Sequence, residues 1–448
     1  MQRRTFLGSL AAAPFAQTDG PPQPPNILLV LFDKCRTDAI GAYEEKNVST
    51  PNLDRLAREG VLFRHAYTPQ ALCGPARASI LTGKYPHAHG LRRNVYFSEP
   101  GGVNTNYRDV IPDPFRDPRF RLWENFVYHL NNAGYTTGAI GKWHLGPGNP
   151  GFFDYFKSFN SLLRHWVGEP HKSRWRPDVH ADDALHFIEQ AGARPWFLQL
   201  SFYAPHEPLD PPKEWLEKYP GKDHREYYAT VSNLDMNVGR VVERLRQRGA
   251  LDNTLVIFTA DHGRPWVERP GTVEGIGVGY EDVIRVPLII RYPRLFAAGR
   301  RWVAGVTTAD LMPTILDAAN ISLNQGLAND REFTPAIHAR SLAAEVRGED
   351  RWSRPIVVQN IPQRGIDGSY YEERVLRTEQ HKLILRKFEI RPVLRPGELY
   401  DLTADPGEGN NLYDRAPALV KEMARQLAQW GETHQDPLAV ELAGWAAR

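Results

Sequence analysis

The segment NILLVLF at residues 26–32 is the feature that most restricts the fold of this chain. Its apolar side chains occupy both alternating positions, which is typical of a parallel strand covered by helices on both faces of its sheet. Similar β patterns recur at 137–142, 196–202 and 254–260, and an apolar helical stripe at 231–245 separates the last two. Strands that alternate with helices predict an α/β fold with a mostly parallel central sheet sandwiched by helices.

Each of these predicted strands runs directly into polar residues. They are Asp33, Lys142, His144, His206, Asp261 and His262. Ligands of open α/β sheets bind beyond the carboxyl ends of the strands, so we expect these side chains to converge on one site.

The composition limits the classes of partner. The 448 residues are 42% hydrophobic and 24% charged, which allows a sizeable core in one large domain or two moderate ones. A net charge of +2 gives no reason to expect nucleic acid or an anionic membrane as a partner. Beyond the N-terminus, the sequence has no apolar run of the ~18 residues that a transmembrane segment needs.

Three segments of the chain differ in character. Residues 1–20 contain Arg3 and Arg4 before a short apolar run, which is the pattern of a twin-arginine export signal, although an ordinary basic N-terminus is the alternative. We therefore expect a periplasmic or secreted protein. We predict a catalytic domain over 21–352 and a smaller C-terminal α+β subdomain over 353–448, with a short antiparallel sheet and a helix.

The chain has two cysteines, Cys35 and Cys73. One disulfide between them would suit an oxidising compartment, and a buried free thiol is the other structural interpretation. Cys73 lies in the motif C-G-P-A-R, which is followed by S-I-L-T-G-K-Y-P.

This motif resembles the signature of the type I, formylglycine-dependent sulfatases of the alkaline-phosphatase-like superfamily. The segments GKWHLG, PHEP and ADHG follow in the family's order, and the resemblance runs from NILLVLFD to GELYDLTADPGEGNNL. It implies an alkaline-phosphatase-like fold and a sulfuric ester hydrolase. It also implies that a formylglycine-generating maturation enzyme oxidises Cys73 to formylglycine.

Oxidation of Cys73 makes chemical sense. A thiolate adduct of a sulfate ester would have no easy exit, whereas an aldehyde hydrate carries two hydroxyls, one of which can attack sulfur. The other then loses its proton, and the carbon–oxygen bond breaks to expel sulfate and restore the aldehyde. Pro75 would open a helix whose N-terminus favours an anionic substrate. The resemblance assigns Arg77 to orienting and stabilising the hydrate.

The resemblance also assigns the other polar residues. Lys142 would bind the sulfate group, His144 would handle the hydrate proton, and His206 would bind sulfate and protonate the leaving oxygen. We expect His87 and His89 to support the site indirectly at most.

A divalent cation is implied at the same place. Asp33, Asp261, His262 and the hydrate of residue 73 would hold it, and their oxygens favour Ca²⁺, with Mg²⁺ as an alternative. The imidazole of His262 leaves Mn²⁺ open as well. The structural alternative for Asp33 is a strand-end cap.

The sequence departs from the family pattern in two places. Lys34 stands where relatives usually have a second acid or an amide, and no lysine precedes Tyr280 where relatives usually have one. We hypothesise that Lys34 supplies the missing sulfate contact. Arg264 and Arg269 are rival donors, and the alternative for Lys34 is a side chain in solvent.

The substrate is the least constrained part. The stretches 95–125 and 164–178 are rich in arginine and aromatic residues and lie between core elements, where loops often form a pocket wall. A sulfated carbohydrate is the first prediction and a simple aryl or alkyl sulfate the second, while loops that merely pack are the alternative. A phosphonate or phosphate diester hydrolase, or a catalytically impaired sulfatase-like binding protein, would fit the same motifs.

Overall fold

The structure is a computed structural model. It describes residues 23–44, 46–95, 113–117, 119–161, 163–168, 174–266, 276–322, 338–360, 370–390 and 395–448. The predicted export signal at 1–20 and Arg269 lie outside these residues. So do residues 96–112 and 169–173 of the two predicted substrate loops.

A sheet of eight strands forms the centre of the molecule, in the order β12-β2-β11-β9-β1-β8-β4-β5. Its strands are β1 (Asn26–Phe32), β2 (Val61–Phe63), β4 (Thr136–Lys142), β5 (Tyr155–Phe159), β8 (Trp196–Phe202), β9 (Thr254–Ala260), β11 (Leu288–Arg291) and β12 (Arg300–Trp302). The strands from β9 to β5 are all parallel, whereas β11 runs antiparallel to β9 and β2. β1 lies between β8 and β9, and Ile27 to Phe32 are buried on both faces, as the apolar run predicts.

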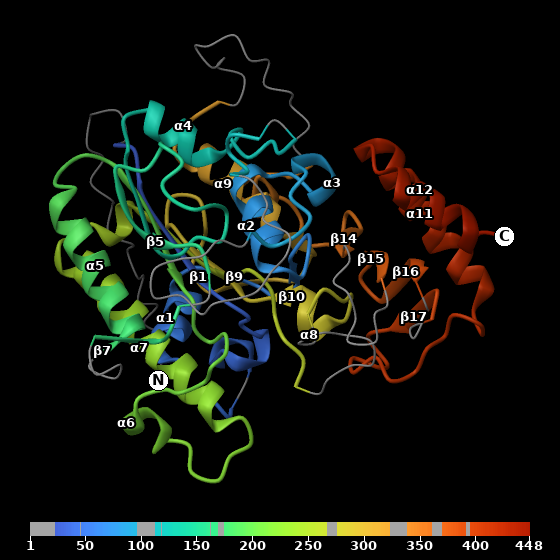
Figure 1. The fold of residues 1–448 in the computed structure, drawn as a ribbon, viewed down its shortest axis with the longest axis horizontal. Coiled ribbons are helices and arrows are strands. Elements are labelled where there is room, and N and C mark those ends of the chain that lie inside the picture. Colours follow the sequence, from blue (N-terminus) through green and yellow to red (C-terminus); the bar gives the residue numbers. More distant parts are fainter. Residues whose placement is uncertain are drawn as a thin grey trace, which may run out of the picture.

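Helices cover both faces of this sheet (Figure 1). α1 (Pro51–Glu59), α5 (Arg176–Gln190) and α7 (Arg225–Gln247) pack together as one group. α2 (Cys73–Thr82), α4 (Phe126–Asn132) and α9 (Leu311–Ala318) pack together as the other. The mixed α/β fold with a mostly parallel central sheet is therefore confirmed.

Short elements connect these layers. The strands among them are β3 (Ala66–Tyr67), β10 (Arg285–Val286) and β13 (Val306–Thr307), which form a three-stranded sheet, and the pair β6 (Trp166–Val167) and β7 (Arg174–Trp175). The helices among them are α3 (Pro86–His89), α6 (Lys213–Leu216), α8 (Glu281–Ile284) and α10 (Leu342–Glu345). In the part of the chain that the structure describes, no helix has both the length and the apolar composition that a membrane crossing requires.

The C-terminal part forms a second, antiparallel sheet. Its strands are β14 (Ile356–Asn360), β15 (Tyr370–Arg377), β16 (His381–Ile390) and β17 (Gly397–Asp401), in chain order. α11 (Pro417–His434) and α12 (Pro437–Ala446) pack on it, and α12 is a helix that the sequence pattern did not predict.

This second sheet also reaches the chain segment that leads into α2. The backbone N–H of Gln359 donates to the carbonyl oxygen of Pro69 at 2.7 Å, and the N–H of Ala71 donates to the side-chain oxygen of Asn360 at 3.1 Å. The edge strand β14 therefore fixes the backbone just before Cys73.

Candidate active site

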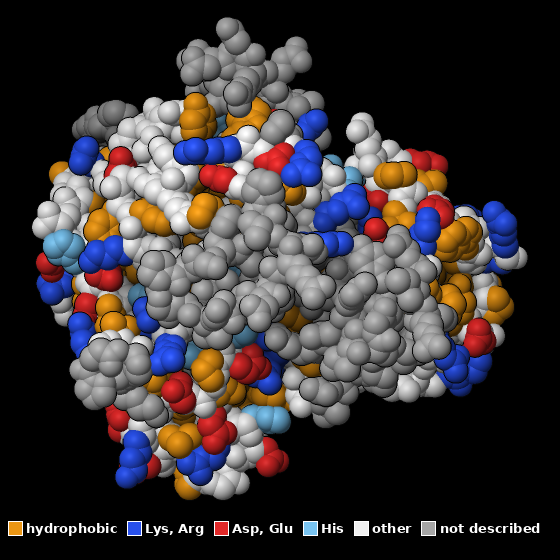
Figure 2. All heavy atoms as spheres, in the orientation of Figure 1, with side chains coloured by type: hydrophobic (Ala, Val, Ile, Leu, Met, Phe, Trp, Pro, Cys, Tyr) orange, Lys and Arg blue, Asp and Glu red, His pale blue; other side chains and the backbone are white. Residues whose placement is uncertain are grey.

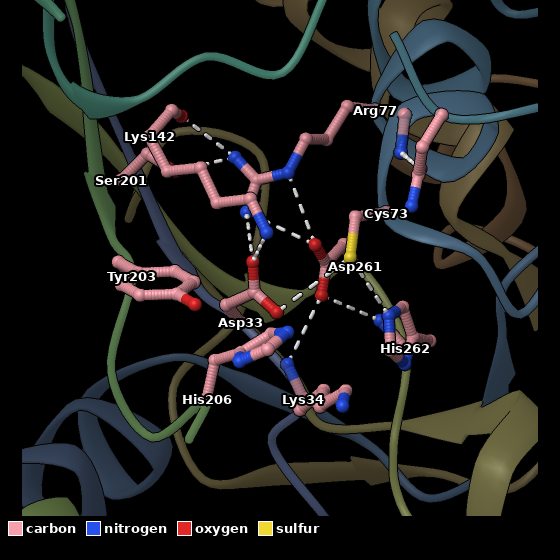
Figure 3. Close-up of polar contacts among 12 residues, drawn as sticks. Asp33, Lys34, Cys73, Arg77, Lys142, Ser201, Tyr203, His206, Asp261 and His262 are labelled. Carbon is pink, nitrogen blue, oxygen red and sulfur yellow. Dashed lines mark hydrogen bonds and ion pairs between the residues drawn. The ribbon is translucent and has the colours of Figure 1, made fainter. Parts of the chain in front are cut away.

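The polar residues that follow β1 and β9 meet the start of α2 at the carboxyl edge of the sheet (Figure 3). Candidate ligand atoms of Asp33, Cys73, Asp261 and His262 all lie within 4.8 Å of one another, and all four residues are buried. The strand-end pattern predicted this convergence, because neighbouring parallel strands end at the same edge.

Cys73 is the first residue of α2, and Pro75 lies in the first turn, where its missing N–H needs no partner. The Cys73 sulfur lies 3.2 Å from Nε2 of His262 and 3.8 Å from Oδ1 of Asp33. Burial and the Asp33 charge raise the pKa of this thiol to about 12. An unmodified Cys73 would therefore be a protonated, weak nucleophile at neutral pH.

Gly74 allows other segments to approach the nucleophile closely. Its N–H donates to Oδ1 of Asn94 at 2.8 Å. A Cβ at this position would lie only 3.1 Å from the same oxygen and 3.3 Å from the carbonyl oxygen of His144.

The disulfide interpretation is wrong, because Cys35 and Cys73 are both free and buried.

Arg77 is held rigidly behind the cluster, one turn along α2 from Cys73. Its Nε lies 3.0 Å from Oδ2 of Asp261, and its Nη2 lies 3.3 Å from Oδ2 of Asp33. Nη1 donates to the hydroxyl of Ser201 at 2.6 Å and to the carbonyl oxygen of Lys142 at 2.8 Å. The guanidinium thus neutralises both carboxylates and has one fixed orientation.

Lys142 is the last residue of β4, and its side chain points at the carboxylate of Asp33. Its ammonium is paired with Oδ2 of Asp33 and lies 5.0 Å from the centre of the Tyr203 ring. Burial alone would raise the pKa of Asp33, but the charges of Lys142 and Arg77 outweigh burial and lower it. Asp33 is therefore an ionised ligand candidate at neutral pH.

His262 presents a lone pair to the cluster. Its Nδ1 lies 2.7 Å from the carbonyl oxygen of Gly263, which can only accept, so the proton is on Nδ1. Nε2 then faces the Cys73 sulfur as an acceptor. Two carboxylates and an imidazole lone pair fit a divalent cation, and an oxygen at residue 73 would suit a hard ion better than sulfur does.

The two other predicted histidines lie beside these groups. The His206 ring stacks on Tyr203 at 4.7 Å, and its Nδ1 lies 3.0 Å from the carbonyl oxygen of Glu207. His144 is buried and has a left-handed backbone with φ of 59°. Burial holds the pKa of His144 well below its usual range, and the charges of Lys142 and Arg77 lower it further. His144 therefore shares the electrostatic environment of the cluster.

Lys34 does not point to solvent, so that alternative is wrong. The residue is 1% exposed, and its ammonium lies 3.2 Å from Oε2 of Glu207. Its backbone N–H donates to Oδ1 of Asp261 at 3.2 Å, with a left-handed φ of 56°. Of the two rival cations, Arg264 also reaches Glu207, with Nη1 2.7 Å from Oε1.

His87 and His89 are bound to other parts of the fold. His87 contacts Gln359 and the carbonyl oxygen of His434 in the C-terminal part, with distances of 2.7 and 2.8 Å. His89 lies 3.1 Å from the hydroxyl of Ser79 within α2.

Several residues that contact the candidate site were not predicted. They include Asn94, Ser201, Tyr203 and Glu207. Ser201 and Tyr203 belong to the carboxyl end of β8 and the residue after it, so the strand-end pattern that selected Asp33 could have found them. Glu207 directly follows His206 in the PHEP segment, so its position after the same strand could have drawn attention to it. No comparable signal marks Asn94.

Comparison with known proteins identifies the family. The sulfatase family profile matches residues 25–321. This chain belongs to the sulfatase family. A second profile, that of the C-terminal region of N-sulphoglucosamine sulphohydrolase, matches residues 278–433. The type I sulfatase resemblance is therefore confirmed, and the family together with its named relatives supports a sulfatase enzyme.

Sulfatases with carbohydrate substrates in their names are among the relatives. An N-acetylgalactosamine-6-sulfatase of Sus scrofa is 32% identical over 70% of this chain and 65% of its own length. An N-acetylglucosamine-6-O-sulfatase of Bacteroides thetaiotaomicron is 25% identical over 93% of this chain and 88% of its own. This chain thus spans about two thirds of the mammalian relative.

Solved structures show the same fold. A Bacteroides fragilis protein assigned as a sulfatase has a TM-score of 0.75 at 25% identity, covering 96% of this chain and 100% of its own. A phosphonate monoester hydrolase of Agrobacterium radiobacter has a TM-score of 0.70 at 20% identity, over 92% of this chain and 96% of its own. At that identity the second likeness shows the fold alone.

Proposed function

We propose that this sulfatase hydrolyses a sulfate monoester on a carbohydrate, through a formylglycine hydrate made from Cys73. The observation that carries the proposal is the buried cluster of Asp33, Cys73, Asp261 and His262, with Arg77 held against its carboxylates. The high pKa of the unmodified thiol, about 12, supports the need for oxidation, because a protonated thiol is a poor nucleophile.

The proposed cation is Ca²⁺, with Mg²⁺ or Mn²⁺ as alternatives, held by Asp33, Asp261, His262 and the oxidised residue 73. When bound, such an ion would polarise the sulfate group and stabilise negative charge on it. Arg77 orients both carboxylates and offsets their charge, since it contacts Asp33 and Asp261 at once.

The substrate contacts in this proposal come from the ends of β1, β4 and β8. The ammonium of Lys142 and that of Lys34 bind sulfate oxygens, and His206 gives a proton to the leaving oxygen. His144 accepts the proton that the second hydroxyl of the hydrate loses when sulfate is expelled. Lys34 is already inside the site, within reach of Glu207, so it can supply the sulfate contact without a rearrangement of the backbone.

The carbohydrate substrate is proposed from the relatives, two of which are named for 6-sulfated N-acetylhexosamines. We further propose that a formylglycine-generating enzyme matures the protein, and that residues 1–20 export it to the periplasm or beyond. The proposed domains remain 21–352 for catalysis and 353–448 for the C-terminal subdomain.

The test combines mass spectrometry with kinetics on protein that is co-expressed with a formylglycine-generating enzyme. The peptide that contains residue 73 should lose the mass expected for conversion of the thiol to an aldehyde, and Cys73→Ala should be inactive. Cys35→Ser is the matched control, because Cys35 is also buried but makes its sulfur contact with the carbonyl oxygen of Arg36.

The converted protein is then offered 4-nitrophenyl sulfate, 6-sulfated N-acetylhexosamines and a phenylphosphonate ester. Faster turnover of the phosphonate would replace the proposal by the diester or phosphonate hydrolase alternative. Full conversion without turnover of any of these esters would favour the impaired binding protein.

A further inference from the structure

Glu207 joins three side chains at the substrate end of the candidate site. Its Oε2 lies 3.2 Å from Nζ of Lys34 and 3.4 Å from Nδ1 of His206. Its Oε1 lies 2.7 Å from Nη1 of Arg264. These contacts join the residues after β1, β8 and β9, so a single carboxylate links three strand ends.

The charges around Lys34 explain why a carboxylate is needed there. The ammonium is 1% exposed, and a buried cation without a counter-charge costs several kcal/mol. The nearby carboxylates of Asp33 and Asp261 already pair with Lys142 and Arg77. Glu207 supplies a further negative charge, and the pKa of its carboxyl falls to about 2 because Lys34 and Arg264 outweigh the effect of burial.

Glu207 also acts on the imidazole of His206. The groups that face this ring or its backbone from the surrounding elements are Lys34, Lys142, His144, His165, Tyr203 and Glu207. Burial and the two lysines lower the pKa of His206, and Glu207 opposes them. Without this carboxylate, two ammonium groups would disfavour a protonated imidazole.

We infer that Glu207 is a positioning residue, which holds the Lys34 ammonium for sulfate binding and lets His206 carry the proton for the leaving oxygen. The inference rests on the proposed function, since it assigns Glu207 to the two side chains that would contact the substrate. It commits Glu207 to an electrostatic role, so removal of its charge alone should impair the reaction.

The decisive variant is Glu207→Gln, which keeps the size and the oxygen acceptor but removes the charge. We expect kcat/KM to fall about 10-fold or more on a sugar sulfate and much less on an aryl sulfate with an acidic phenol, which needs little protonation. The limb of the pH–rate profile that requires protonated His206 should move to lower pH.

The matched control is Glu44→Gln. Glu44 is an exposed carboxylate that also bridges two cations, with Oε1 3.3 Å from Nη1 of Arg64 and 2.7 Å from Nη1 of Arg301. It contacts no residue of the candidate site, so its kinetics should be unchanged. Equal kinetics for the Glu207 and Glu44 variants would overturn the inference. An equal loss on every leaving group with an unmoved pH profile would overturn it too.

A second measurement does not depend on sulfatase activity. Thermal unfolding of Lys34→Met, Glu207→Gln and the double variant forms a cycle for the pair. The double variant should be less destabilised than the sum of the two single variants, because each single change removes the same Lys34–Glu207 ion pair and the sum counts that pair twice. If the wild type hydrolyses no sulfate ester, the proposed function fails. Additive shifts in Tm would then refute the role of Glu207 separately.

Discussion

Replacement of Arg77 by methionine should destabilise the metal-free protein by an amount that the contacts of its guanidinium set. Arg77 is 3% exposed and contacts the carboxylates of Asp33 and Asp261 at 3.3 and 3.0 Å. Removal of one partner from a buried ion pair costs about 3–5 kcal/mol, because the remaining charge has lost its solvent and its counter-ion. An unfolding entropy of about 2.1 cal/mol/K per residue, over 448 residues, converts this cost into a loss of about 3–5 °C in Tm.

The assay is thermal unfolding of the wild type and Arg77→Met, first with a chelator and then with Ca²⁺. The variant lacks one positive charge beside the two carboxylates, so Ca²⁺ should bind the variant at least as tightly as it binds the wild type. Ca²⁺ should therefore reduce the difference in Tm between the wild type and Arg77→Met. The variant should nevertheless be inactive, since its carboxylates have lost the group that orients them.

Arg374→Met is the matched control for this experiment. Arg374 lies in the C-terminal part and is 1% exposed. It forms a bidentate ion pair with Asp436, in which Nε lies 2.6 Å from Oδ2 and Nη2 lies 3.0 Å from Oδ1. Its loss should cost a similar free energy of unfolding, but Ca²⁺ should restore nothing beyond its effect on the wild type. If Ca²⁺ rescues both variants equally, or neither, then Arg77 does not share its carboxylates with a cation and the reasoning is refuted.

Three further predictions test other parts of the structure. Gly141→Ala should cost at least about 3 kcal/mol of stability, because φ is 88° and the new Cβ would lie 1.9 Å from the carbonyl oxygen of Ser201; urea unfolding that matches the wild type would contradict this. Burial lowers the pKa of His180 to about 3 in the folded protein, whereas the unfolded chain keeps a pKa of about 6.5. Above pH ~6.5 this difference does not reduce the unfolding free energy. Between pH ~6.5 and 3 the unfolding free energy falls by about 1.4 kcal/mol for each pH unit, because only the unfolded state binds the proton. His180→Met should flatten the dependence of the unfolding free energy on pH between 6.5 and 4, and an unchanged slope would count against it. Burial also raises the pKa of the Cys35 thiol, so iodoacetamide at pH 8 should label it in denaturant but not in the native protein, as read by mass spectrometry.

The sequence was sufficient for the parts of the site that backbone direction decides. A run that is apolar on both faces predicts a buried parallel strand, and such strands end at a common edge whatever their loops do. Asp33, Asp261 and His262 follow directly from β1 and β9, and the prediction that they meet is confirmed by their positions. Cys73 needed the family resemblance, because no periodicity shows where the N-terminus of α2 lies.

The sequence was insufficient to predict contacts between side chains of segments that lie far apart along the chain. Lys34 has a left-handed backbone, which turns its side chain toward Glu207 rather than into solvent. That choice depends on a carboxylate 173 residues away, and no local pattern encodes it. The link from Asn360 to Ala71 is equally remote, so the support that β14 gives to the nucleophile segment was not predicted.

The balance of buried charge connects these details to the chemistry. Among the described residues, four cations and three carboxylates meet at the candidate site: Lys34, Arg77, Lys142, Arg264, Asp33, Asp261 and Glu207. Each of these cations lies beside a carboxylate, which limits the cost of burying their charges. A divalent cation would add positive charge in a poorly solvated space, and a sulfate monoester would enter as the group that reduces this excess. Loss of Glu207 would raise the excess without adding any contact to the ester. Reaction rate rather than substrate attraction should therefore suffer in Glu207→Gln.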